Sequence, residues 1–262
     1  MNQALQTTVN VVEPPSEGVV HVWRASISDL SATLVATDYK HVLSDEETVK
    51  YQAYLARQAK LEFLLGRLMI RTLLSRYFPE IEPRDWKFSF NPYGKPIVEN
   101  APLPIDLSLS HSGGFVVLAF TLGAEVGIDI ECARASLDVA DLASSVFSPG
   151  ELVFLLAQQP SRLAETFYRF WTLKEAYIKA RGMGLSLPLD QFTFRLPQTD
   201  ELPQRVSITF DSGIEDSPDS WWFGVESYRG HAVAIALKRD GKAAKILRRD
   251  FLLDEFTLSR SG

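Results

Sequence analysis

The amino-acid sequence predicts an α+β fold that is built from two halves. Helical stripes of apolar residues and short alternating strands occur in both halves of the chain. They do not follow the regular strand-helix-strand alternation of a doubly wound parallel sheet. We place the boundary near residues 123–125, which gives an N-terminal part of residues 1–124 and a C-terminal part of residues 125–262.

The N-terminal part is expected to contain two helices. Ser44 and Glu47 have the spacing of a capping box, which predicts that a helix starts there. A second helix is expected over about 59–78, because leucines recur along one stripe, and Pro79 follows its end. A turn at 91–96 and three strands complete this part, the strands being 19–23, 105–110 and 115–121.

The C-terminal part is expected to begin with a strand over 126–131. A helix at 151–157 and a long helix over about 161–181 follow, and Gly182 is a typical stop signal for the second. Further strands are expected at 192–196, 206–210, 221–227 and 231–238, the last two as a hairpin.

Composition excludes several classes of protein. The 262 residues are 46% apolar and 23% charged, which is typical of a globular protein with a sizeable core. The single cysteine, Cys132, rules out an internal disulfide and a cysteine-based zinc site. A net charge of −6 argues against general nucleic-acid binding. We find no apolar span of roughly 20 residues and no secretory signal, so we expect a cytoplasmic protein without nucleic-acid or membrane partners.

Two carboxylates share one face of the strand expected over 126–131. Side chains alternate along a strand, so Asp129 and Glu131 point one way and the apolar residues between them point the other. Two steps of about 3.3 Å separate them, close enough for both to bind one cation, and such hard oxygen ligands suit Mg²⁺. A solvated strand edge with two acidic residues is the alternative.

Glu175 and Lys179 lie four residues apart in the long helix expected over 161–181. Aromatic residues, among them Trp171, form a stripe on this helix that is expected to be buried. The spacing places Glu175 and Lys179 together at the edge of that stripe, where they can reach a site. The alternative is an ordinary exposed Glu–Lys pair that stabilises the helix.

Ser110 and His111 follow an alternating strand and precede Gly113 and Gly114. A histidine in such a position can donate to a phosphate oxygen, and the glycines let backbone approach the phosphate. A loop histidine with a structural partner is the alternative. We do not expect a Ser-His-Asp triad, because the chain lacks a G-x-S-x-G elbow and adjacent strand residues point to opposite faces.

Taken together and in this order, these segments resemble the 4′-phosphopantetheinyl transferases of the long, two-lobed type. The runs W-x-x-K-E-x-x-x-K and G-[IV]-D-x-E are the signatures of that family, and this chain carries both, with a Ser-His-Ser run upstream. The matching segments are 56–71, 93–96, 107–112, 126–131 and 167–190. The resemblance implies two pseudo-symmetric α+β lobes, one active site at their interface, and a monomer.

The resemblance also implies a reaction. A 4′-phosphopantetheine group is transferred from coenzyme A to a serine of an apo acyl, peptidyl or aryl carrier protein, and 3′,5′-ADP is released. Asp129, Glu131 and Glu175 resemble the three carboxylates that bind Mg²⁺, with Mn²⁺ as the alternative ion. Glu175 resembles the general base and Lys179 a lysine on the pyrophosphate, so the expected catalytic residues are Asp129, Glu175 and Lys179.

Binding of coenzyme A is implied by further matches to the family. The Ser-His pair matches positions that contact phosphate groups, an arginine with a nearby lysine is expected at the 3′-phosphate, and a Gly-Lys-Pro turn matches a segment on the adenosine side. Taken singly, such cations are more often solvated charges. The expected contacts are Lys50, Arg57, Gly94, Lys95, Pro96, Ser110, His111 and Lys179.

The resemblance also leads us to expect a surface that binds the carrier protein. Arg67 and Arg71 are expected on the surface that docks an acidic carrier, while Glu47 stands where some relatives have a basic residue.

Two other functions remain open. A metal-dependent hydrolase of nucleotide pyrophosphates would use the same acids with water as nucleophile. A non-catalytic module would bind coenzyme A or the carrier only, although the intact set of acids argues against it.

Overall fold

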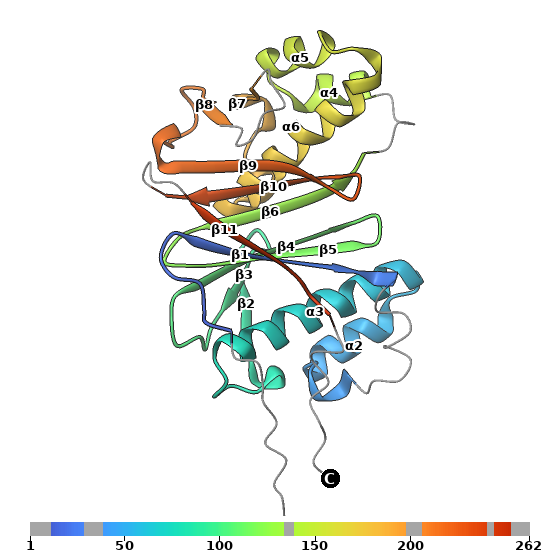
Figure 1. Cartoon of the computed structure of the whole chain (residues 1–262), viewed down its shortest axis with the longest axis vertical. Helices are drawn as coiled ribbons and strands as arrows, with labels where there is room; N and C mark the ends of the chain where they lie inside the picture. The colour runs from blue at the N-terminus through green and yellow to red at the C-terminus, as the bar shows by residue number, and fades with distance from the viewer. Residues whose placement is uncertain (1–11, 29–38, 134–138, 198–205, 240–243, 253–262) are drawn as a thin grey trace, which may run out of the picture.

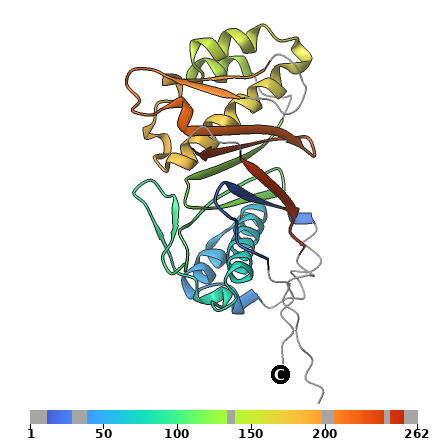
Figure 2. The ribbon, with the colours of Figure 1, turned by 60° about the vertical axis from the view of Figure 1, so that its left-hand side comes forward.

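The computed structural model describes residues 12–28, 39–133, 139–197, 206–239 and 244–252. In these ranges the structure is a mixed α+β fold, as the sequence predicts. Its two larger sheets lie between two groups of helices (Figures 1 and 2). None of the helices in the described ranges combines the length and the apolar character that crossing a bilayer requires.

A four-stranded sheet organises the N-terminal part. Its strand order is β11-β1-β5-β4, with bounds Lys245–Asp250, Val19–Ser26, Phe115–Leu122 and Ile105–Ser112. β1 and β4 pair antiparallel with β5, and β11 pairs parallel with β1. The sequence pattern did not predict β11, because four of its six residues are charged. The chain thus returns from the C-terminal part to the first sheet, and the division at residue 124 stays a prediction.

Two helices and a β-hairpin complete the N-terminal part. They are α2 (Asp45–Ala53), α3 (Arg57–Tyr77) and the antiparallel pair β2 (Phe88–Phe90) and β3 (Pro96–Val98). The capping box at the start of α2 is confirmed, because Ser44 Oγ accepts from Glu47 N and the Glu47 side chain binds the Ser44 N–H.

A three-stranded antiparallel sheet organises the C-terminal part. Its order is β6 (Val126–Cys132), β10 (His231–Lys238) and β9 (Trp221–Tyr228). The long helix α6 (Pro160–Arg181) packs on it so closely that a Cβ at Gly127 would lie 1.8 Å from the Ala176 carbonyl oxygen. The other elements are α4 (Val139–Val146), α5 (Pro149–Leu156), β7 (Phe192–Arg195) and β8 (Ser207–Phe210). Short 3-10 helices lie at Tyr39–His41, Pro83–Asp85, Gly184–Ser186, Leu189–Gln191 and Pro218–Ser220.

Apolar cores hold these layers together. One lies between α3 and the first sheet, and another between α6 and the second sheet. A third core joins the two sheets, with Val20 and Val22 of β1 packed in the same cluster as Ile128 and Ile130 of β6. Each such buried side chain contributes about 1.5–3 kcal/mol relative to exposure, so the sheets have a fixed relative position.

The edge strands β4 and β6 meet where the two sheets join. Alternate side chains of β4 point at β6: Asp106, Ser108 and Ser112 accept hydrogen bonds from its backbone N–H groups at 2.7, 3.1 and 3.2 Å. We call the row Asp106, Ser108, Ser110 and Ser112 the polar seam. It places the last residues of β4 directly beside Asp129 and Glu131.

Candidate active site

Three carboxylates from two elements surround one hollow. Asp129 and Glu131 lie on β6, and Glu175 lies on α6, which packs against that strand. The hollow has a volume of about 380 Å³ and is lined by Leu109, Ser110, His111, Asp129, Glu131, Trp171, Glu175 and Lys179. The structure therefore brings together residues that lie on three separate segments of the sequence.

Asp129 is the most buried of the three carboxylates, with 3% of its surface exposed. Its Oδ1 accepts hydrogen bonds from Ser110 Oγ at 2.7 Å and from Lys179 Nζ at 2.6 Å. Its Oδ2 is buried and has no hydrogen-bond partner among the described residues. A buried carboxylate oxygen without a donor is costly, so Oδ2 is suited to an added cation or donor.

Glu131 is held from both sides of the junction. Ser112 Oγ, at the end of β4, donates to Glu131 Oε2 at 2.8 Å, and the Trp171 side chain of α6 also forms a hydrogen bond with this carboxylate. Burial raises the pKa of Glu131, the negative charge of Asp129 raises it further, and these hydrogen bonds oppose the shift.

Glu175 and Lys179 lie one turn apart on α6, as their spacing predicts. Burial raises the pKa of Glu175, the charges of Asp129 and Glu131 add to this, and the Lys179 ammonium opposes it. Lys174 lies beside Glu175 in the sequence but faces away, because its fully buried ammonium pairs with Glu151 at 2.8 Å. Lys174, the lysine that directly precedes Glu175 in the signature run, therefore has a structural role.

A second hollow of about 240 Å³ adjoins the first, because both are lined by Leu109, Glu175 and Lys179. Gly94, Lys95 and Pro96, the three residues of the expected coenzyme A segment, line it. They come from the turn of the β2–β3 hairpin, which reaches toward the end of α6 (Figure 2).

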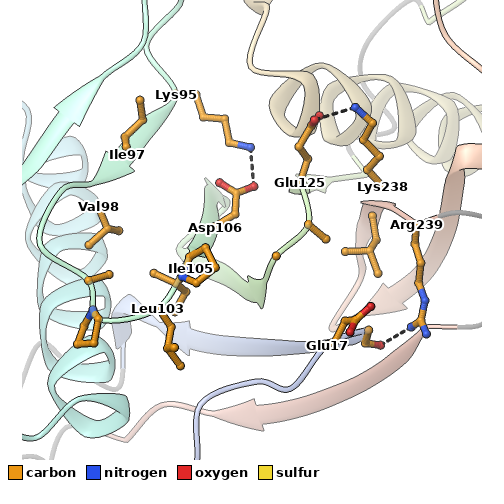
Figure 3. A pocket seen from close by; sticks show the side chains of 17 residues that line it. Glu17, Lys95, Ile97, Val98, Leu103, Ile105, Asp106, Glu125, Lys238 and Arg239 are labelled. Carbon is orange, nitrogen blue, oxygen red and sulfur yellow. Dashed lines mark hydrogen bonds and ion pairs between the residues drawn. The ribbon is translucent and has the colours of Figure 1, made fainter.

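Lys95 also makes the contacts that hold this turn in place. Its ammonium forms an ion pair with Asp106 at 2.6 Å (Figure 3) and donates to the Ala180 carbonyl at 2.9 Å. The contact of this side chain with coenzyme A stays a prediction, and its ammonium also ties the hairpin to the C-terminal end of α6.

The two cations expected at the 3′-phosphate lie apart from the carboxylates. Arg57 is exposed at the first position of α3 and does not line the carboxylate hollow. Lys50 lines a different hollow on the α2 side and stacks over the Phe63 ring at 5.6 Å. The structure does not bring either into contact with the three carboxylates.

The expected carrier-docking role of Arg71 is wrong. This side chain is 3% exposed, pairs with Glu47 at 2.6 Å, and also donates to the Pro83 and Trp86 carbonyl oxygens. Arg67 is 19% exposed and lies 3.7 Å from the same Glu47. Glu47, which stands where some relatives are basic, thus caps α2 and binds both arginines.

Sequence reasoning missed three residues that hold the site. Ser112 and Trp171 bind Glu131, and Glu62 of α3 lies 3.2 Å from His111, between its Oε2 and the histidine Nδ1. The alternation of Asp106, Ser108, Ser110 and Ser112 was visible, but it did not reveal that β6 lies opposite. Glu62 carried no sequence signal, since its partner is distant in the chain.

A bound metal is compatible with these donors but is not preassembled. In the described ranges, no three His, Cys, Asp or Glu side chains are already arranged as a metal centre. Lys179 instead neutralises part of the charge of Asp129. The free Oδ2 of Asp129 and the raised pKa values of Glu131 and Glu175 fit a site that gains stability from a cation.

Comparison with known proteins gives the family. Residues 125–236 match the family model described as 4′-phosphopantetheinyl transferase superfamily, and residues 22–122 match the one described as 4′-phosphopantetheinyl transferase, N-terminal. The 4′-phosphopantetheinyl transferase Sfp of Bacillus subtilis is 35% identical over 181 residues, which are 67% of this chain and 78% of that relative. The chain belongs to the 4′-phosphopantetheinyl transferase superfamily. It is an enzyme that transfers 4′-phosphopantetheine groups.

A second sequence relative agrees with that assignment. The 4′-phosphopantetheinyl transferase HetI of Nostoc is 31% identical over 183 residues, covering 69% of this chain and 76% of the relative. Among solved structures, a holo-(acyl-carrier-protein) synthase from Bacillus anthracis is similar with a TM-score of 0.35 and 20% identity, over 44% of this chain and 94% of that one. The family assignment rests on the sequence relatives.

Proposed function

We propose that this transferase moves the 4′-phosphopantetheine arm of coenzyme A onto a serine of an apo acyl, peptidyl or aryl carrier protein and releases 3′,5′-ADP, acting as a cytoplasmic monomer. The observation that carries the proposal is the meeting of Asp129, Glu131, Glu175 and Lys179 around one hollow. Phosphoryl-type transfer needs the charge on the phosphates neutralised and the attacking hydroxyl positioned and deprotonated. This set of residues supports both needs.

Asp129, Glu131 and Glu175 would hold the divalent metal, for which we propose Mg²⁺ with Mn²⁺ as the alternative. The chemistry of the donors supports this, since carboxylate oxygens suit hard cations. The unpartnered Oδ2 of Asp129 and the repulsion among the three acids support it as well. When bound, the metal would neutralise charge on the pyrophosphate oxygens.

Glu175 accepts the proton of the carrier serine in this proposal. Its raised pKa makes it a stronger base once it is ionised, which suits general base catalysis near neutral pH. Lys179 lies one turn away and places a positive charge beside the same hollow, where it stabilises negative charge on the leaving 3′,5′-ADP.

Coenzyme A would span the two adjoining hollows. Gly94 and Pro96 support an adenosine position in the second hollow, and His111 supports a phosphate position in the first. Ser110 uses its hydroxyl proton on Asp129, so we assign its side chain to orienting that carboxylate while its backbone remains beside the phosphates. Arg57 is retained as the proposed partner of the 3′-phosphate.

The direct test is the intact mass of an apo carrier protein incubated with the enzyme, coenzyme A and Mg²⁺. We expect the mass to increase by one phosphopantetheine arm, and we expect EDTA to prevent the gain. Consumption of coenzyme A without a carrier, with no gain in carrier mass, would instead favour the pyrophosphate hydrolase. Coenzyme A binding without either reaction on acyl, peptidyl and aryl carriers would contradict the proposal.

A further inference from the structure

His111 is contacted from behind by an acidic residue of α3. Its Nδ1 lies 3.2 Å from Glu62 Oε2, and Gln58 Nε2 donates to the other Glu62 oxygen at 2.8 Å. The Glu62 side chain is 13% exposed, whereas that of His111 is 47% exposed. The less exposed carboxylate is therefore fixed by its neighbours, and it restrains the more exposed imidazole.

Only the histidine of this pair reaches the carboxylate hollow. His111 lines the hollow and Glu62 does not. Because a carboxylate only accepts hydrogen bonds, the contact makes Nδ1 the protonated nitrogen and leaves Nε2 for another group. An imidazole that donates to a phosphate from Nε2 carries protons on both nitrogens, and a carboxylate at Nδ1 compensates that charge.

We propose that Glu62 is a positioning residue that acts through His111 to bind a phosphate group of coenzyme A. This inference rests on the proposed function, because the phosphate role of His111 belongs to it. Repulsion acts in the opposite direction, because the negative charge of Glu62 near an anionic ligand weakens binding. Removal of this carboxylate therefore weakens ligand binding if the positioning of His111 dominates, and strengthens it if repulsion dominates.

The test is equilibrium binding of 3′,5′-ADP to the wild type, Glu62→Ala, His111→Ala and the double variant. We expect Glu62→Ala to raise the Kd about fivefold, the scale of the net contribution of one ordinary hydrogen bond. His111→Ala should raise it at least as much, and the double variant should bind no more weakly than His111→Ala. Unchanged or tighter binding by Glu62→Ala would overturn the inference, as would a loss in the double variant that is the product of the two single losses.

Two controls separate this role from folding and from the proposed function. Glu46→Ala removes an exposed carboxylate of α2, and it should leave the Kd unchanged. In ¹⁵N-resolved NMR spectra, the Nδ1–H signature of His111 should be lost in Glu62→Ala, and its retention would also overturn the inference. If His111→Ala itself binds 3′,5′-ADP normally, the phosphate role of His111 is wrong, which is a failure of the proposed function rather than of Glu62 alone.

Discussion

Ser110 Oγ donates a hydrogen bond of 2.7 Å to Asp129 Oδ1, from the edge of one sheet to the edge of the other. Lys179 Nζ binds the same oxygen at 2.6 Å. Oδ1 of Asp129 therefore accepts two hydrogen bonds, and Oδ2 is the oxygen that remains available to a cation. Each part of the chain thus supplies what the other lacks: the carboxylate comes from β6 and its orienting hydroxyl from β4.

Replacing this hydroxyl should weaken the proposed metal site. In Ser110→Ala, Asp129 loses one of its two donors, and removing a partner of a buried group costs about 1–3 kcal/mol. We expect kcat/KM for carrier modification to fall roughly tenfold and the Mg²⁺ concentration for half-maximal rate to rise. Rates measured over a Mg²⁺ titration would check this.

Ser108→Ala is the matched control for that substitution. Ser108 is a buried neighbour in the polar seam, and its hydroxyl binds the Ile128 N–H at 3.1 Å without touching a carboxylate. It should lower stability by a similar amount and leave the Mg²⁺ dependence unchanged. An equal change in Mg²⁺ dependence for both variants would mean that the seam acts on the site only through general packing.

Glu175→Gln should abolish transfer while sparing coenzyme A binding. The amide keeps the shape of the side chain but removes both the proposed base and one proposed metal ligand, so we expect a rate loss of roughly 10²–10⁴-fold. Carrier mass and calorimetric binding of coenzyme A would measure the two effects separately. Glu165→Gln, an exposed residue earlier on α6, is the control and should be as active as the wild type.

Local patterns were sufficient to predict much of the fold and the chemistry of the site. Alternation on β6 correctly placed Asp129 and Glu131 together, and helical spacing placed Glu175 beside Lys179. The capping box at Ser44 was also confirmed. These features depend on residues that are close in the chain, where periodicity of 2 or 3.6 fixes the direction of each side chain.

Features that depend on distant contacts could not be predicted in this way. Lys95 and Arg71 have the sequence appearance of ligand-binding cations, but the first binds Asp106 and the second binds Glu47. Which of the chain's 27 Lys and Arg residues are consumed by internal carboxylates is decided by tertiary packing. β11 was missed for the same reason, since its place in the first sheet comes from pairing with β1, far away in the sequence.

Lys95→Met should destabilise the protein much more than Lys238→Met. Both lysines form ion pairs beside the same large hollow (Figure 3), but the Lys95–Asp106 side chains are 15% and 24% exposed, against 43% and 41% for Lys238–Glu125. Leaving the less exposed Asp106 unpaired should cost about 2 kcal/mol, while a surface pair contributes under about 1 kcal/mol. Urea unfolding of both variants would compare them, and equal losses would contradict the clamping role of Lys95.

His21 is part of a buried network that requires its neutral form. Trp23 Nε1 donates to the Tyr77 hydroxyl at 2.8 Å, and His21 Nδ1 forms a hydrogen bond with the same hydroxyl at 2.9 Å. Protonation of His21 would place a positive charge in this buried network, whose other members are the neutral side chains of Trp23 and Tyr77. Burial lowers the pKa of His21 from 6.5 to about 4, and the nearby Arg249 charge adds to this effect.

Stability should therefore depend on pH through His21. The unfolded chain binds a proton near pH 6.5 and the folded chain only near pH 4, so the contribution of His21 is complete above pH 6.5 and is lost as the pH falls toward 4. At about 1.4 kcal/mol per pH unit, this loss amounts to ~3 kcal/mol. In His21→Gln, which does not titrate, the free energy of unfolding should decline less over this window than in the wild type. Parallel pH profiles from urea unfolding of the two proteins would show that His21 is not held neutral by this network.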